Sequence, residues 1–159
     1  MKAAELIRQL TDISKRKLDL LERIEAFTLK QGECIKSGRL EEAEGIIEEK
    51  QKLMDAVDKL DSDFADCSVR LKNLLNISSF ESLPGFNIPG TKELKDLVGK
   101  IYALLGKIKK ADDENTALIK NELEQTGRNI SHANTFKKAS KAYGSVKPVN
   151  SSYFFDKKN

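Results

Sequence analysis

The fold of this chain is decided by residues 53–75, which read LMDAVDKLDSDFADCSVRLKNLL. Alternating steps of four and three residues along this stretch reach an apolar side chain every time, at Leu53, Val57, Leu60, Phe64, Cys67, Leu71 and Leu74. This spacing places the seven side chains on one face of an α-helix, as the seam along which helices pack together. We therefore expect a long amphipathic helix with one buried face.

A similar seam precedes it in residues 3–36. The same stepping reaches nine positions, of which seven are apolar: Leu6, Leu10, Ile13, Lys17, Leu20, Ile24, Phe27, Gln31 and Cys34. Gly38, next to Ser37, is expected to end this helix, because glycine readily adopts the positive φ of a helix C-cap. A second helix over 39–75 follows, and two helices joined by so short a connection form an antiparallel hairpin.

The second helix begins with many charged side chains. Leu40, Ala43 and Ile46 or Ile47 lead into its apolar seam. We interpret the intervening charges as a solvated surface, formed by Glu41, Glu42, Glu44, Glu48, Glu49, Lys50 and Lys52.

The helical pattern breaks between residues 76 and 90, where Pro84-Gly85 and Pro89-Gly90 indicate a loop. A third helix is predicted over 91–143, and Gly127 is where we expect it to bend or fray. Its seam is apolar at Leu97, Ile101, Leu104, Ile108 and Ala111, polar at 112–115, and apolar again at Leu118, Ile119, Leu123, Ile130, Ala133, Phe136, Ala139 and Tyr143. The sequence thus predicts an all-α, elongated bundle of three long helices over 1–143, with a disordered, flexible basic tail over 144–159.

Composition argues against most enzymes. Charged residues make up 33% of the chain and aromatic residues 6%, without tryptophan, which suits long helices better than a β-sandwich. A single histidine, His132, and two cysteines, Cys34 and Cys67, cannot build a Cys/His zinc site. No nucleotide-binding or hydrolase motif occurs. We expect no catalysis, no cofactor and no metal, with both cysteines as small buried hydrophobes.

The acidic run Asp112-Asp113-Glu114 has two interpretations. Paired carboxylates can bind a divalent cation, but the spacing matches no known cation-binding loop. A solvated surface, or a polar layer that fixes the register of the helices, is favoured instead.

The cellular location follows from two absences. Residues 1–30 carry charges throughout, and no run approaches 18 apolar residues, so we expect a cytoplasmic protein that does not insert into a membrane.

The last 32 residues differ from the rest. They hold seven basic residues against one acid, a net charge of +6. They also hold five of the ten aromatic residues, and exposed aromatic side chains are typical of partner-binding surfaces. We predict that a partner contacts Ile130, Ala133, Phe136, Ala139, Tyr143, Tyr153, Phe154 and Phe155. There are two alternatives: the aromatic side chains fold back onto the bundle, or the lysines bind nucleic acid.

Three stretches resemble the FlgN-type flagellar export chaperones of type III secretion. They are Arg39–Ala43 with Glu48–Leu53, then Asp112-x-x-Asn115-x-x-Leu118-Ile119, and the ending Ser151-Ser152-Tyr153-Phe154-Phe155-Asp156-Lys157-Lys158. The first two are similar to a Glu/Lys/Gln-rich stretch and to an N-x-x-N-x-x-L-[LI] pattern of the family, although Asp112 stands where the pattern has asparagine. The third is similar to an S-x-x-F-[FI]-D-K-K ending.

The resemblance implies a function. Such a chaperone binds the terminal helical segments of hook-associated proteins, prevents their premature assembly and delivers them to the flagellar export gate. It implies no small-molecule substrate, and self-association when the client is absent. Two other classes stay open: a generic coiled-coil adapter or scaffold whose seams form a permanent homo-oligomer, and a helical protein associated with nucleic acid.

Overall fold

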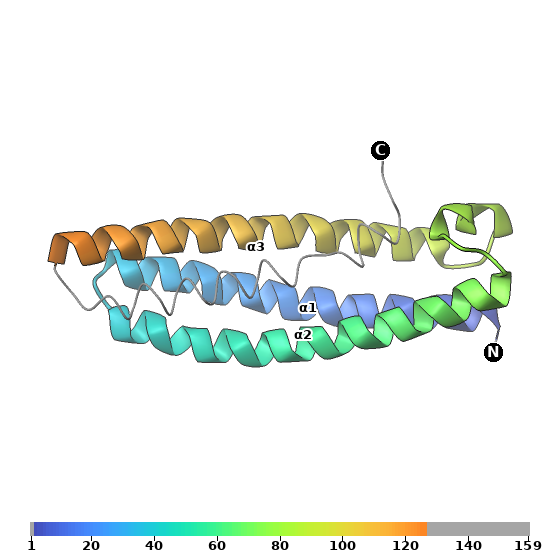
Figure 1. The fold of residues 1–159 in the computed structure, drawn as a ribbon, viewed down its shortest axis with the longest axis horizontal. Helices are drawn as coiled ribbons and strands as arrows, with labels where there is room; N and C mark the ends of the chain where they lie inside the picture. Colours follow the sequence, from blue (N-terminus) through green and yellow to red (C-terminus); the bar gives the residue numbers. More distant parts are fainter. Residues whose placement is uncertain (1, 127–159) are drawn as a thin grey trace. The chain divides into compact units, whose positions relative to one another are not determined.

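The computed structural model describes residues 2–126. They form three long α-helices, α1 (Ala3–Lys36), α2 (Leu40–Leu75) and α3 (Thr91–Thr126), and a short 3-10 helix, η1 (Phe80–Phe86) (Figure 1). No strand occurs among residues 2–126. The prediction of an all-α fold with three long helices is confirmed. The predicted continuation of the third helix over 127–143 and the predicted tail over 144–159 lie outside the described residues.

The turn between α1 and α2 has the geometry of a Schellman motif. Gly38 has φ 75°, its N–H donates to the Ile35 carbonyl at 3.1 Å, and the Arg39 N–H donates to the Cys34 carbonyl at 2.8 Å. A side chain at Gly38 would be strained in this conformation. The predicted helix end at Gly38 is therefore confirmed, and the connection is as short as a hairpin requires.

The predicted loop over 76–90 contains a structured element. Asn76, with φ 56°, ends α2 in the same way that Gly38 ends α1. The Ser79 hydroxyl then accepts the Glu81 N–H at 3.1 Å and caps η1. Phe80 and Leu83 of η1 are buried, so this connection contributes to the core as well as joining two helices.

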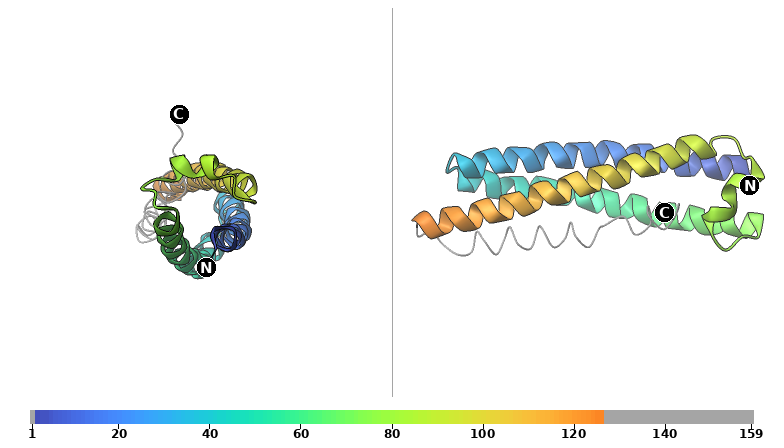
Figure 2. Two further views of the ribbon diagram at one scale, coloured as in Figure 1. Left: turned by 90° about the vertical axis from the view of Figure 1, so that its right-hand side faces the viewer. Right: turned by 90° about the horizontal axis from the view of Figure 1, so that it is seen from above.

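The described chain divides into two compact units. Unit 1 comprises residues 2–20 and 56–103, and unit 2 comprises residues 21–55 and 104–126. Each unit therefore contains a part of all three long helices. Within unit 2, α1 and α3 run in the same direction and α2 runs in the opposite direction (Figure 1, Figure 2).

The core of unit 1 contains three of the seven residues of the seam that predicted the second helix, namely Phe64, Cys67 and Leu71. Its buried side chains are Leu6, Ile7, Leu10, Phe64, Cys67, Leu71, Phe80, Leu83, Leu94 and Val98. Two seam residues depart from the prediction: Leu60 is only half-buried, and Leu74 is 49% exposed. Leu75 packs against the core instead of Leu74, because 3.6 residues per turn drift away from a strict heptad repeat.

The core of unit 2 packs the parts of α1 and α2 on either side of the Gly38 turn against α3. Its buried members are Cys34, Ile35, Leu40, Ala43, Ile46 and Ile119, with Phe27, Ile47, Leu118 and Leu123 packed around them. Cys34 in this cluster and Cys67 in unit 1 are both free and buried, which confirms their prediction as small core residues. No described helix carries an apolar stretch that could cross a bilayer.

Candidate functional site

The residues predicted to contact a partner lie outside residues 2–126. These are Ile130, Ala133, Phe136, Ala139, Tyr143, Tyr153, Phe154 and Phe155. The single histidine, His132, also lies outside residues 2–126. Within the described residues, the unusual side chains are polar groups that occupy seam positions. They fall into one group in each unit.

The group in unit 2 is centred on Lys50 of α2, whose side chain is 2% exposed. Its Nζ donates to Gln31 Oε1 of α1 at 2.6 Å and to Asp112 Oδ1 of α3 at 3.0 Å. Gln31 Nε2 donates to the Ala43 carbonyl at 3.2 Å. One buried ammonium thus ties together all three helices.

Asn115 extends this group by one turn of α3. Its Nδ2 donates to the Thr28 carbonyl of α1 at 2.8 Å, while the Thr28 hydroxyl donates to the Ile24 carbonyl at 2.7 Å. Gly32 makes room for Asn115, since a Cβ atom at that position would lie 2.7 Å from Asn115 Oδ1. We refer to Thr28, Gln31, Lys50, Asp112 and Asn115 as the polar layer.

Burial shifts the pKa values of the two charged groups of the polar layer. Burial raises the pKa of Asp112 above the ordinary carboxyl value, and the ammonium of Lys50 opposes that change. Burial likewise lowers the pKa of Lys50, opposed by the carboxylate of Asp112. Asp112 Oδ2 is buried and has no hydrogen-bond partner within the described part of the chain. The pair therefore loses much of its hydration and recovers only part of it through contacts.

The interpretation of Lys50 as part of a solvated surface was wrong. Stepping backwards from Leu53 by three and four residues reaches Lys50, Ile46 and Ala43, so Lys50 occupies a seam position. Its long side chain reaches acceptors on the other two helices, which offset the cost of burying its charge. For the run 112–114, the structure favours the polar layer at Asp112, whereas Asp113 and Glu114 are exposed.

We expect Gly32→Ala to test the close approach of Asn115, with Gly45→Ala as its matched control. Alanine favours a helix over glycine by about 1 kcal/mol, and nothing lies within 4 Å of a Cβ atom at Gly45. Gly45→Ala should therefore stabilise the chain. In Gly32→Ala, the new methyl group displaces Asn115 and breaks its hydrogen bond to Thr28, which is worth about 1 kcal/mol.

Urea unfolding measures both variants. Gly32→Ala should be less stable than Gly45→Ala by about 1–2 kcal/mol. Equal free energies of unfolding would show that Asn115 moves aside at no cost.

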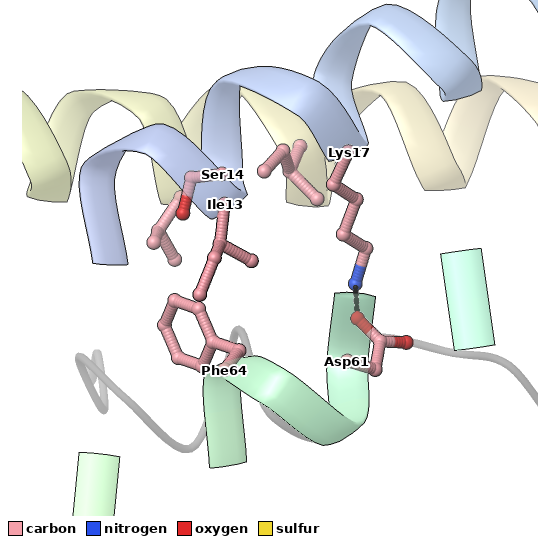
Figure 3. Close-up of a pocket in the computed structure, with 7 residues that line it drawn as sticks. Ile13, Ser14, Lys17, Asp61 and Phe64 are labelled. Carbon is pink, nitrogen blue, oxygen red and sulfur yellow. Dashed lines mark hydrogen bonds and ion pairs between the residues drawn. The ribbon is translucent and has the colours of Figure 1, made fainter. Parts of the chain in front are cut away.

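The group in unit 1 pairs Lys17 of α1 with Asp61 of α2. Their Nζ and Oδ1 atoms lie 2.6 Å apart, and the Lys17 side chain is 6% exposed. Figure 3 shows Lys17 reaching across to Asp61, beside the Phe64 ring and Ile13. The pair lies in a small pocket lined by Ile13, Ser14, Lys17, Asp61, Phe64, Val98 and Ile101. The only charged position of the first seam is thus neutralised by a partner on the next helix.

Neither group resembles a metal centre. Within residues 2–126, no three His, Cys, Asp or Glu side chains are placed to hold a metal ion. Burial raises the pKa of both the Cys34 and the Cys67 thiol, which lowers the fraction present as the reactive thiolate. Both polar groups are suited to joining helices in a defined register.

Comparison with known proteins decides the family. A family model described as FlgN protein matches residues 1–148. The chain belongs to the FlgN family. This is a family of flagellar export chaperones. No curated protein and no solved structure gives a significant match.

Two of the three stretches that carried the FlgN resemblance contribute residues to unit 2, whereas the third, 151–158, lies outside residues 2–126. Lys50 comes from the Glu/Lys/Gln-rich stretch, and Asp112 and Asn115 come from the third-helix pattern. Ile119 of that pattern is fully buried in the apolar cluster next to them. Asp112, which departs from the asparagine of the FlgN pattern, forms the ion pair with Lys50. These motif residues therefore connect the helices of unit 2 through hydrogen bonds and an ion pair.

Proposed function

We propose that this FlgN family member is a cytoplasmic export chaperone for hook-associated proteins, which form the hook–filament junction. It binds their terminal helical segments, prevents premature assembly and delivers them to the flagellar type III export apparatus. The match of the FlgN model to residues 1–148 is the observation that carries this proposal.

The architecture is compatible with such a role. Clients of this kind present an amphipathic helix, and packing a helix into an apolar groove between helices is a common mode of peptide recognition. A client segment that orders on binding loses several kcal/mol of the interaction energy, so the complex stays releasable. Binding and release of this type require no chemical step.

The proposed client contact includes the apolar spacing beyond Gly127. Ile130, Ala133, Phe136, Ala139 and Tyr143 recur at helical intervals, and Tyr153, Phe154 and Phe155 would supply a second contact, to the client or to the export gate. The net charge of +6 over residues 128–159 would attract an acidic partner.

Removal of residues 128–159 should separate folding from client binding. Among residues 2–126, every member of the two apolar clusters precedes residue 124, so the truncated chain keeps all of these core side chains. We expect a nearly unchanged melting temperature by circular dichroism and loss of client binding. Unfolding of the truncated chain would show that the removed residues are ordinary core, and native affinity would show that they make no client contact.

Phe136→Ala in the full chain tests the same contact by a single change. If Phe136 is a buried anchor, its loss should cost about 2 kcal/mol of binding free energy, roughly a thirtyfold weaker Kd. Lys138→Ala, outside the apolar spacing, is the control and should change the Kd by less than about threefold. Isothermal titration with a purified client measures both, and equal effects would contradict the anchor.

Co-expression tests the chaperone function directly. A hook-associated protein should stay soluble and monomeric when produced with this chain, and the two should elute together in size-exclusion chromatography. A chain that forms a stable oligomer of its own and leaves the solubility of the client unchanged would instead be a coiled-coil scaffold.

A further inference from the structure

The part of α3 in unit 2 packs on the hairpin through a seam that contains both apolar and polar side chains. Its fully or nearly buried positions are Leu104, Ile108, Asp112, Asn115 and Ile119. The seam is apolar in its first two positions, polar in the next two and apolar in the last. The helix segment 112–126 thus has fewer buried apolar side chains than the segment before it.

The polar layer holds this segment only weakly. A buried ion pair is usually worth no more than a well-packed apolar pair, because desolvation of both charges cancels most of their attraction. One oxygen of Asp112 also has no hydrogen-bond partner in the described chain. Segments with few buried apolar contacts open more readily than the rest of a protein. Residues 112–126 are the part of unit 2 that meets this description.

The surface beneath 112–126 would suit an incoming helix. Cys34 and Ile35 of α1 and Leu40, Ala43 and Ile46 of α2 form an apolar face that shares its cluster with Ile119. At the edge of this face, Lys50 and Gln31 present an ammonium and an amide to the third helix. The complementary ligand is an amphipathic helix with an apolar seam and one carboxylate or amide at the position of Asp112.

We propose that residues 112–126 are a displaceable cover, and that a terminal helix of the client replaces them on the α1–α2 hairpin. The proposal rests on the proposed function and names a client groove for it. The client helix takes the place of Asp112 beside Lys50 and the place of Ile119 in the apolar cluster. The polar layer keeps the cover closed without making its release costly.

Two buried cysteines report on opening in the native chain. Cys34 belongs to the apolar cluster covered by α3 in unit 2, whereas Cys67 belongs to the core of unit 1. If 112–126 opens locally, a thiol reagent should modify Cys34 through that opening, with Cys67 reacting more slowly. Single-cysteine variants, Cys67→Ala and Cys34→Ala, assign the two rates.

An apolar replacement of the ion pair should close the cover. We expect Lys50→Met with Asp112→Leu in the full chain to slow modification of Cys34 about tenfold and to leave Cys67 unchanged. It should also weaken binding of a purified terminal segment of a hook-associated protein about tenfold, which corresponds to ~1.4 kcal/mol. Gly32→Ala, which displaces Asn115, should accelerate Cys34 modification and tighten binding, whereas Gly45→Ala should do neither.

The outcomes separate this proposal from the proposed function. If the native chain binds the segment, and neither Lys50→Met with Asp112→Leu nor Gly32→Ala changes the Cys34 rate or the Kd, the displaceable cover is wrong and the chaperone function stands. Equal Cys34 rates in all variants would show that the reagent reaches Cys34 by fraying near the Gly38 turn and not by opening of 112–126. If the native chain binds no hook-associated segment, the proposed function fails and the assigned client groove fails with it.

Discussion

Asp112→Leu alone should destabilise the chain by about 3–5 kcal/mol, the usual effect of removing one partner from a buried ion pair. The ammonium of Lys50 would keep only the contacts it makes elsewhere, including Gln31 Oε1 at 2.6 Å, while its side chain stays 2% exposed. Adding Lys50→Met should recover most or all of this loss, because an apolar pair of similar volume avoids the desolvation of two charges. Denaturant unfolding of Asp112→Leu, of Lys50→Met, of the double variant and of the native chain measures the cycle.

The pH dependence of Asp112→Leu follows from the lowered pKa of Lys50. Burial lowers this pKa below 10.5, and loss of the Asp112 carboxylate removes the interaction that opposes the shift. The unfolded chain then binds a proton at Lys50 more tightly than the folded chain, so stability rises with pH through the lowered pKa and levels off near 10.5. The double variant, which lacks both groups, should show no such rise relative to the native chain.

Two results would contradict this description of the polar layer. An Asp112→Leu variant as stable as the native chain would show that Lys50 reaches water. A double variant as unstable as the single one would show that the volume of the layer matters more than its charge.

Leu71→Asp should abolish the folded state, whereas Leu74→Asp should be tolerated. Leu71 is fully buried in the core of unit 1 and Leu74 is 49% exposed, although both occupy the predicted seam. Removing a buried leucine side chain costs about 2–5 kcal/mol, and burying an unpaired carboxylate adds several more. The sum is comparable to the whole stability of a domain, about 5–15 kcal/mol.

Circular dichroism and soluble yield measure this pair. Leu74→Asp should cost about 1 kcal/mol or less, mainly from a negative charge near the C-terminal end of α2. Equal effects of the two substitutions would mean that α2 presents its strict heptad face to the core, and that Leu75 does not replace Leu74.

The helices could be predicted because their burial is periodic. Apolar spacing located three long helices, and Gly38 marked the hairpin turn because positive φ has a strong residue preference. The spacing could not place Leu74 correctly, since drift of the helical repeat accumulates toward the end of α2. The burial of Phe80 and Leu83 in η1 could not be predicted from spacing either, because it depends on contacts with distant segments.

The polar layer was predictable only in part. Gln31 was counted as an exception within the first seam, and a register-fixing layer at Asp112 was one of two interpretations. The burial of Lys50 depends on acceptors that lie 19 and 62 residues away in sequence, a coincidence that only the packed helices create. Periodicity offers one signal for a buried charge, namely a charged residue at a seam position. Lys17 and Lys50 both occupy such positions.

The client contact beyond Gly127 rests on sequence spacing and stays a prediction. Its assignment to Phe136 and Tyr143 would change if residues 128–159 proved dispensable.

The most direct test of the chaperone assignment is a calorimetric titration of the full chain with the terminal segment of a purified hook-associated protein. We expect saturable binding with a defined stoichiometry and, from titrations at several temperatures, a negative heat-capacity change from apolar burial. Absence of binding to every hook-associated protein of the same genome, together with a stable oligomer of the chain alone, would contradict the assignment and favour a coiled-coil scaffold.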